Sequence, residues 1–214
     1  MTKFLLWFAI MGKLQETAKR LTASQRRELL VAAALKVMRT DGVAAATTRA
    51  ICNEAGMPQS AFHYCFHTKK DLYRALLATE IDFDLDGIWP SAIAGTNLEA
   101  RVSSIMLAWW GAIEAEPNSQ LVLFELSDLA LRDPELQDLA QWEQQAALKK
   151  ATQAIDRVVS ETGVKLDPPL EELAEMVIAA LDGVARSWLR HRDNKRARQT
   201  ITNFAAAITA FATK

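Results

Sequence analysis

Residues 47–72, with the sequence TTRAICNEAGMPQSAFHYCFHTKKDL, constrain the fold most, because helix start and stop signals follow one another closely. Thr47 can cap a first helix with its hydroxyl, and Gly56 can end it in the left-handed backbone region. Pro58 can open a second helix, where its missing N–H costs nothing. This pattern predicts a helix-turn-helix, a motif whose second helix can lie in the DNA major groove. The residues predicted to face inward are Ile51, Cys52, Ala55, Ala61, Phe62 and Phe66.

Over about residues 24–75 the chain resembles the TetR family of bacterial transcriptional regulators. The matching residues are Leu30, Ala33, Ala34, Met38, Gly42, Thr47, Ile51, Ala55, Gly56, Phe62, Phe66, Lys69 and Leu72. Pro58, His63 and Cys65 depart from the usual family pattern of Ser and Tyr at these positions. The resemblance implies an all-α fold, in which a three-helix helix-turn-helix domain precedes a larger helical domain for ligand binding and dimerisation.

We therefore expect three segments: an N-terminal extension at residues 1–20, the DNA-binding domain at 21–70, and the effector-binding and dimerisation domain at 71–214. The extension begins MTKFLLWFAIMG, and its apolar run is far shorter than the ~20 residues that span a bilayer. Three interpretations stay open for it: a translation start assigned too early, an extra helix that packs on the body, or a segment for export or membrane attachment.

Apolar periodicity and turn residues predict helices along most of the chain, with no convincing strand. Ser24 is a candidate cap for the first helix and Asn97 for a later one. Pro and Gly residues at 89–95 predict a break, and Pro117 predicts an interruption. The predicted helices outside the central motif are residues 24–40, 69–86, 97–116, 121–131, 136–160, 170–191 and 197–211.

Charge is distributed unevenly, although the chain carries a formal net charge of only −1. Residues 13–74 hold eleven Lys and Arg residues and five acidic residues, whereas residues 75–214 hold thirteen Lys and Arg residues and twenty-one acidic residues. A basic segment on an acidic body suits a polyanion that binds at one end. We therefore expect double-stranded DNA as a partner, no membrane partner and a cytoplasmic location. Two cysteines in a chain of this length do not indicate a disulfide framework.

The DNA-reading side chains should lie on the exposed face of the second motif helix and at the starts of its two neighbours. Gln59 can read adenine with two hydrogen bonds, and Arg49 can reach a guanine edge or a phosphate. Lys69 and Lys70 begin the following helix and should hold the DNA backbone. The predicted DNA-binding residues are Thr47, Thr48, Arg49, Gln59, Ser60, Ala61, His63, Tyr64, His67, Lys69 and Lys70.

Metal binding and enzymatic activity are not expected, and no cofactor is indicated. His63 and His67 share a helix face, but Cys65 lies about 200° round the helix from His63, so three ligands would not converge. The sequence contains no G-x-S-x-G, P-loop, G-x-G-x-x-G or H-E-x-x-H motif.

The body is predicted to enclose an apolar effector site, because five of the six tryptophans lie between residues 89 and 188. Ordinary core packing is the alternative interpretation for each aromatic residue. The effector would be small and largely apolar, and a second possibility is that the body docks another protein and senses no ligand. The candidate pocket residues are Met106, Trp109, Trp110, Phe124, Glu125, Asp128, Trp142, Gln145, Met176 and Trp188.

The last two predicted helices each carry an apolar stripe and are predicted to form a homodimer interface. The alternative is that both stripes are buried within one protomer. The predicted interface residues are Val177, Leu181, Val184, Trp188, Ile201, Phe204, Ile208 and Phe211. Together these features predict a ligand-responsive repressor that binds a palindromic operator as a dimer and is released by its effector.

Overall fold

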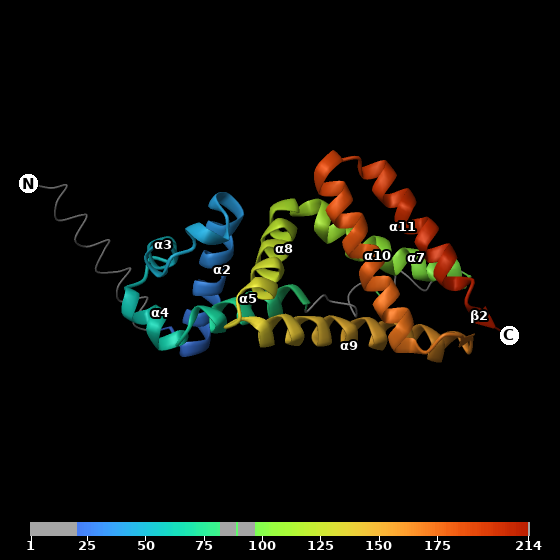
Figure 1. Cartoon of the computed structure of the whole chain (residues 1–214), viewed down its shortest axis with the longest axis horizontal. Helices are drawn as coiled ribbons and strands as arrows, with labels where there is room; N and C mark the ends of the chain where they lie inside the picture. The colour runs from blue at the N-terminus through green and yellow to red at the C-terminus, as the bar shows by residue number, and fades with distance from the viewer. Residues whose placement is uncertain (1–20, 82–88, 90–96, 214) are drawn as a thin grey trace, which may run out of the picture. The chain divides into compact units, whose positions relative to one another are not determined.

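The structure, a computed structural model, describes residues 21–81, 89 and 97–213 (Figure 1). These residues are almost entirely helical, as expected, and the chain divides into two compact units between Leu76 and Leu77. The predicted domain boundary after residue 70 and this division both fall within the same helix, α5 (Lys69–Ile81). The predicted extension at residues 1–20 lies outside the described residues.

The first unit is a small helical domain in which α2 packs against η1, α3 and α4. Its core is formed by one face of α2, including Leu30, Ala34 and Met38, together with the aromatic side chains that follow in the chain. Its elements are α2 (Ala23–Asp41), the 3₁₀ helix η1 (Val43–Ala45), α3 (Thr48–Glu54), α4 (Gln59–Cys65) and the start of α5.

The predicted cap of the first helix was wrong, because Thr22 and not Ser24 caps α2. The Thr22 hydroxyl accepts from the Gln25 backbone N–H at 3.2 Å, and the Gln25 side chain accepts from the Thr22 N–H at 2.9 Å. This reciprocal pair is a capping box, which satisfies two helix-end donors at once. Ser24 lies inside the helix, where its hydroxyl donates to Glu28.

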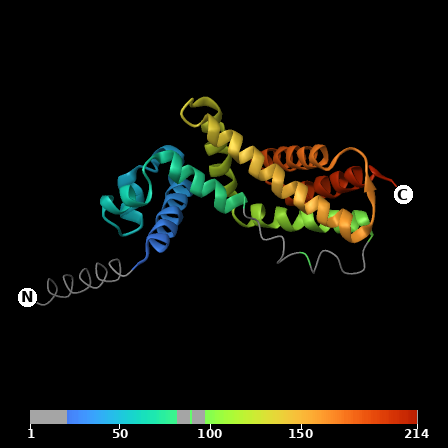
Figure 2. The ribbon, with the colours of Figure 1, turned by 90° about the horizontal axis from the view of Figure 1, so that it is seen from below.

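The second unit, here called the body, consists of five helices and a two-stranded antiparallel pairing among its described residues (Figure 2). In it α11 packs on α7 and α10, and α9 packs on α8 and α10. The elements are α7 (Leu98–Ala115), α8 (Pro117–Arg132), α9 (Gln137–Thr162), β1 (Lys165–Leu166), α10 (Leu170–His191), α11 (Asn194–Thr209) and β2 (Ala212–Thr213).

The body confirms some predicted helix ends and corrects others. Asn97 caps α7 as expected, and α10 has the predicted bounds. Pro117 begins α8 at its first helical position and does not interrupt a helix, so α8 starts earlier than predicted. The short β1–β2 pairing was not predicted, since two-residue strands carry no alternation. Of the predicted helix at 69–86, residues 82–86 lie outside the described residues, as does the predicted break apart from Trp89.

Candidate functional site

A tight turn joins α3 to α4 in the first unit, and its backbone geometry matches the sequence signals. The Thr47 hydroxyl accepts from the Ala50 N–H at 3.2 Å, which confirms Thr47 as the cap of α3. Gly56 has φ +64°, in the left-handed region that favours glycine. Its N–H donates to the Asn53 carbonyl, and the Met57 N–H donates to the Cys52 carbonyl at 2.9 Å. This pair of bonds is a Schellman motif, which ends α3 sharply.

The inner face of α4 anchors the helix to the rest of the unit. Phe62 and Phe66 are 3% and 1% exposed, and their ring centroids lie 5.4 Å apart. Cys52 on α3 is buried as predicted, and this burial raises the pKa of its thiol. A thiol that resists ionisation is a weak nucleophile, so Cys52 acts as a small core residue.

The outer face of α4 carries the side chains expected to read DNA. Tyr64 is 69% exposed, and His63 packs its ring edge-on against Phe62 with centroids 5.8 Å apart. The structure therefore brings the predicted polar residues to one continuous surface. Those exposed on α4 and just after it are Gln59, Ser60, His63, Tyr64 and His67, whereas Ala61 is half-buried.

The helices on either side of α4 present the predicted phosphate-binding residues near their first turns. Arg49 is exposed on α3, next to the half-buried Thr48. Lys69 is exposed at the start of α5, whereas Lys70 is half-buried and interacts with other groups of the chain. Positive side chains beside free helix N–H groups favour an anion such as a DNA phosphate.

A second capping box, which the sequence analysis missed, fixes the start of α5. The Thr68 N–H donates to an Asp71 carboxylate oxygen at 2.9 Å, and the Asp71 N–H donates to the Thr68 hydroxyl at 3.2 Å. The first of these bonds lowers the pKa of Asp71, because it stabilises the charged carboxylate. The Thr-x-x-Asp spacing in the sequence was the signal for this cap.

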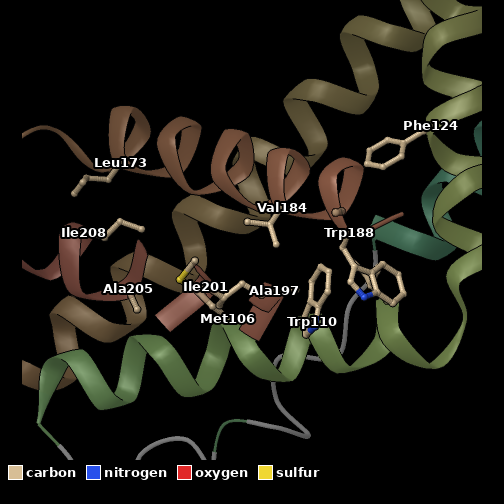
Figure 3. Close-up of a cluster of buried hydrophobic side chains, with 12 residues drawn as sticks. Met106, Trp110, Phe124, Leu173, Val184, Trp188, Ala197, Ile201, Ala205 and Ile208 are labelled. Carbon is tan, nitrogen blue, oxygen red and sulfur yellow. The ribbon is translucent and has the colours of Figure 1, made fainter. Parts of the chain in front are cut away.

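The predicted effector residues divide into two groups that the structure does not bring together. Met106, Trp110, Phe124 and Trp188 lie in the hydrophobic core of the body, and Trp109 packs against that core (Figure 3). Trp142 is half-buried on α9. The remaining candidates are exposed and lie outside this core: Glu125, Asp128, Gln145 and Met176.

Trp110 and Trp188 form an aromatic pair inside the core. Their ring centroids are 5.2 Å apart in an edge-to-face arrangement (Figure 3). The Trp110 indole donates to Glu114 at 2.7 Å, and the Trp188 indole donates to Asn194 at 2.7 Å. With both N–H groups satisfied, the pair behaves as ordinary core packing.

The sequence analysis missed two acidic residues of the body: Glu143, which is half-buried on α9, and Asp182, which is exposed on α10. Desolvation by the surrounding helices raises the pKa of Glu143 on α9 and of Asp182 on α10. The Ser127 hydroxyl donates to Glu143 at 2.7 Å, and the negative charge of Asp182 adds to the upward shift at Glu143. Arg186 acts in the opposite direction on Asp182. No sequence signal distinguished these two carboxyl groups from ordinary surface acids.

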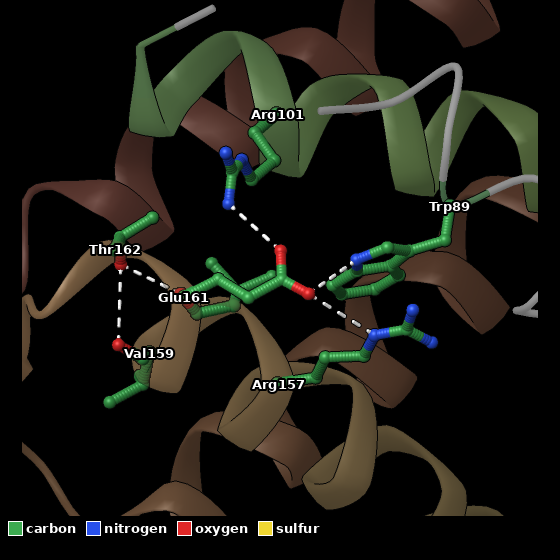
Figure 4. Close-up of polar contacts among 7 residues, drawn as sticks. Trp89, Arg101, Arg157, Val159, Glu161 and Thr162 are labelled. Atoms are coloured by element: carbon green, nitrogen blue, oxygen red, sulfur yellow. Dashed lines mark hydrogen bonds and ion pairs between the residues drawn. The ribbon is translucent and has the colours of Figure 1, made fainter. Parts of the chain in front are cut away.

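A polar cluster in the body surrounds the carboxylate of Glu161, near the end of α9 (Figure 4). Trp89 is 2% exposed, and its indole N–H donates to Glu161 at 2.8 Å. Arg101 on α7 bonds the other carboxylate oxygen at 3.2 Å. Arg157 lies 3.4 Å from the carboxylate and stacks over the Trp89 ring, 4.0 Å from its centroid. One acidic side chain thus joins Trp89, α7 and α9.

The apolar stripes of α10 and α11 are directed into the protomer, which corrects the predicted interface. Val184, Trp188, Ile201 and Ile208 are buried in the core, because α7 supplies an apolar surface opposite α11. Val177 and Leu181 are half-buried against the same core. Of the predicted interface residues, only Phe204 and Phe211 are exposed, at 37% and 36%.

Metal-binding side chains are not clustered in the described ranges 21–81, 89 and 97–213, where no three His, Cys, Asp or Glu residues are grouped as an ion would require. In the same ranges no helix has both the length and the apolar character to cross a membrane.

Residues 30–76 match the family model described as "Bacterial regulatory proteins, tetR family". The HTH-type nicotine-responsive transcriptional repressor HdnoR of Paenarthrobacter nicotinovorans is 27% identical over 181 residues, covering 81% of this chain and 92% of that protein.

Solved structures share the fold over nearly their whole length. A transcriptional regulator from Rhodococcus sp. Rha1 aligns with a TM-score of 0.69 and 20% identity, covering 87% of this chain and 97% of that one. The regulator FadR from Bacillus subtilis, in complex with stearoyl-CoA, aligns with a TM-score of 0.64 and 12% identity, covering 83% and 96%.

An anchored helix-turn-helix with an exposed polar face, followed by a helical body, defines a DNA-binding transcription regulator. Over residues 30–76 the chain carries the helix-turn-helix domain of the TetR family of bacterial transcriptional regulators, and its relatives over most of its length are transcription regulators. The relatives of this chain are transcription regulators and not enzymes.

Proposed function

We propose that this protein is a ligand-responsive repressor, which binds a palindromic operator as a homodimer and leaves it when a small, largely apolar molecule binds the body. The observation that carries the proposal is the exposed polar face of α4, whose inner face Phe62 and Phe66 hold in place. Resemblance over most of the chain to a repressor named for its response to nicotine supports the repressor mode and the small effector. Operator binding requires the cytoplasm as the site of action.

At the operator, the exposed residues of α4 read base edges and the basic residues of α3 and α5 hold phosphates. In this proposal Gln59 and Tyr64 contact bases, and Arg49 and Lys69 contact the backbone, which is supported by the exposure of all four side chains. A dimer presents two such helices about 34–36 Å apart, one turn of DNA, which requires a palindromic site.

The homodimer would use the outer face of α10 and α11, opposite the stripes that the core buries. Met176 is 44% exposed on α10, Phe204 is exposed on α11, and Phe211 is exposed just after the end of α11. Gly183 lies on the exposed part of α10, where a Cβ would meet nothing within 4 Å in the protomer. Large apolar side chains beside a glycine suit close packing of two helix pairs.

Replacing Phe204 with Asp tests the interface, because a charge at a desolvated helix contact opposes association. The matched control is Leu131→Asp, which places the same charge on α8 at a side chain that is 74% exposed. We expect F204D to sediment as a monomer and L131D to remain a dimer. The interface is misplaced if F204D remains a dimer at micromolar concentration.

The effector would contact interior side chains of the body that remain from the predicted set, namely Met106, Trp109 and Trp142. Binding can release DNA only if the ligand prefers the conformation that binds operator poorly. The names of the relatives indicate which compounds to try first, namely nicotine and related amines, and long-chain acyl-CoA.

One experiment tests the whole proposal: selection of bound fragments from genomic DNA, followed by release with that metabolite panel. We expect enrichment of a palindromic fragment and release by at least one small compound. Enrichment without release by any compound, together with co-purification of a protein on the fragment, would favour the alternative that the body docks a protein partner. Failure to enrich any sequence at low salt would contradict operator recognition itself.

A further inference from the structure

The C-terminal end of the recognition helix α4 poses a structural problem, because α4 has only seven residues. A helix this short is unstable in isolation, and its last carbonyl groups have no partners within the helix. The residue after α4, Phe66, has an extended backbone with φ −138° and ψ 117°, so the left-handed cap that ends α3 is absent here. Another part of the chain must therefore satisfy this helix end.

Arg27 on α2 supplies that interaction. Its Nη1 donates to the carbonyl oxygen of Cys65, the last residue of α4, at 2.9 Å. Its guanidinium group also lies over the Phe66 ring, with Cζ 4.4 Å from the centroid. A cation at a helix C-terminus complements the helix dipole, and a guanidinium over an aromatic ring adds a cation–π contact. One side chain thus holds both the end of α4 and the aromatic anchor that follows it.

We propose that Arg27 is a positioning residue for DNA recognition: it fixes the orientation of α4 on α2 and so the angle at which the polar face meets the bases. Arg27 precedes residues 30–76, which match the family model, and the predicted DNA contacts do not include it. Its charge is directed at the end of α4, so it contributes to specificity through helix geometry. Direct phosphate contacts, by contrast, contribute to binding of every sequence and to its salt dependence.

The test compares Arg27→Met with Lys69→Met in the full-length protein, using the fragment recovered from genomic DNA and a scrambled duplex of equal length. We expect R27M to lower operator affinity about tenfold, which is the size expected for loss of a charge-assisted hydrogen bond and a cation–π contact. Binding to the scrambled duplex should change little, and the slope of log K against log salt should stay that of the parent. K69M should weaken both duplexes and reduce that slope by about 1.

A second readout needs no DNA. Amide hydrogen exchange in R27M should quicken about tenfold at the end of α4, at residues 65 and 66, while the amides of α2 keep their protection. Arg27→Lys should recover part of the loss, because an ammonium can donate to the Cys65 carbonyl but lacks the planar stacking group. Lys36→Met is the control: it removes a charge from α2 at a surface pair with Glu54, and should change neither readout.

Two results would overturn the proposal. A salt slope that falls by about 1 in R27M would make Arg27 a phosphate contact. Unchanged exchange at residues 65 and 66, with unchanged discrimination between the two duplexes, would make its contacts with α4 irrelevant to recognition. If R27M does not fold, the same two readouts applied to R27K decide between these outcomes.

Discussion

The DNA-binding unit and the body hold their helices in place by different means. In the first unit, α3 and α4 have seven residues each, and their ends are fixed by a Thr47 cap, a Gly56 turn and the Arg27 contact. In the body, helices of sixteen to twenty-six residues pack through apolar stripes. Short helices depend on interactions at their ends, whereas long helices depend on packing along their length. Single polar substitutions should therefore affect DNA recognition more than they affect the fold of the body.

The strongest test of this comparison removes the aromatic anchor of α4. Phe62→Ala should destabilise the first unit by about 3–5 kcal/mol, because it leaves a cavity where a buried ring was. Operator binding should be lost, while most of the tryptophan fluorescence stays that of the folded body, since five of the six tryptophans lie in the body. The comparison fails if the fluorescence of F62A shifts to that of exposed tryptophan under the same conditions.

A smaller loss is expected when a base-reading side chain is truncated and the fold is left intact. Gln59→Ala should cost roughly 1–3 kcal/mol on the operator and relax the preference at one base pair. Lys69→Ala should weaken binding to all sequences and flatten the salt dependence by about 1. Titrations of a base-substitution series at several salt concentrations separate the two effects. Unchanged operator affinity in both variants would show that α4 and the start of α5 do not face DNA.

The same contrast explains what the sequence could predict. In the first unit, the Thr47 cap and the Gly56 turn act through their immediate neighbours in the chain, so their roles could be inferred correctly. Helical spacing was enough to place Phe62 and Phe66 on the inner face of α4. The cap at Ser24 was misassigned because two hydroxyl residues stand close together, and only Thr22 has a Gln25 positioned to complete a capping box.

In the body, the prediction of which helix faces are exposed failed for a different reason. Helical spacing showed that Val184 and Ile201 lie on apolar stripes, but not that α7 would cover them. The partly desolvated carboxyl group of Glu143 was missed because acidic residues are usually solvated, and only the packing of α8 on α9 places it otherwise.

Glycine substitutions compare a backbone constraint in one unit with ordinary helix propensity in the other. Gly56→Ala should destabilise the first unit by about 1–2 kcal/mol, because its φ of +64° is unfavourable for a residue with a Cβ even though space is open. Gly111→Ala in α7 also has open space and should stabilise the body by roughly 0.5–1 kcal/mol. Chemical denaturation of each variant measures both values. If both substitutions changed the free energy of unfolding by the same amount in the same direction, Gly56 would carry no special backbone constraint.

The smallest expected effect concerns pH and the desolvated acids of the body. A carboxyl group whose pKa is raised in the folded state favours folding less as pH rises through that pKa, because the unfolded chain holds the charge at lower cost. Glu143→Gln removes this cost and keeps an oxygen that can accept from Ser127. The melting temperature at pH 8 should therefore rise, by on the order of 2–4 °C if the gain is about 1 kcal/mol. The gain should shrink toward zero as pH falls to about 4, near the ordinary pKa of the carboxyl group.

The control for this pH dependence is Asp156→Asn, which removes a negative charge from an exposed position of the same helix, α9. It should leave the melting temperature nearly unchanged at every pH, because a solvated carboxylate gains or loses little on folding. A melting temperature of E143Q below that of the parent at pH 8 would mean that the ionised Glu143 accepts a hydrogen bond worth more than its desolvation. In that case the body, like the first unit, would depend on individual polar contacts, and the contrast between the two units would not hold.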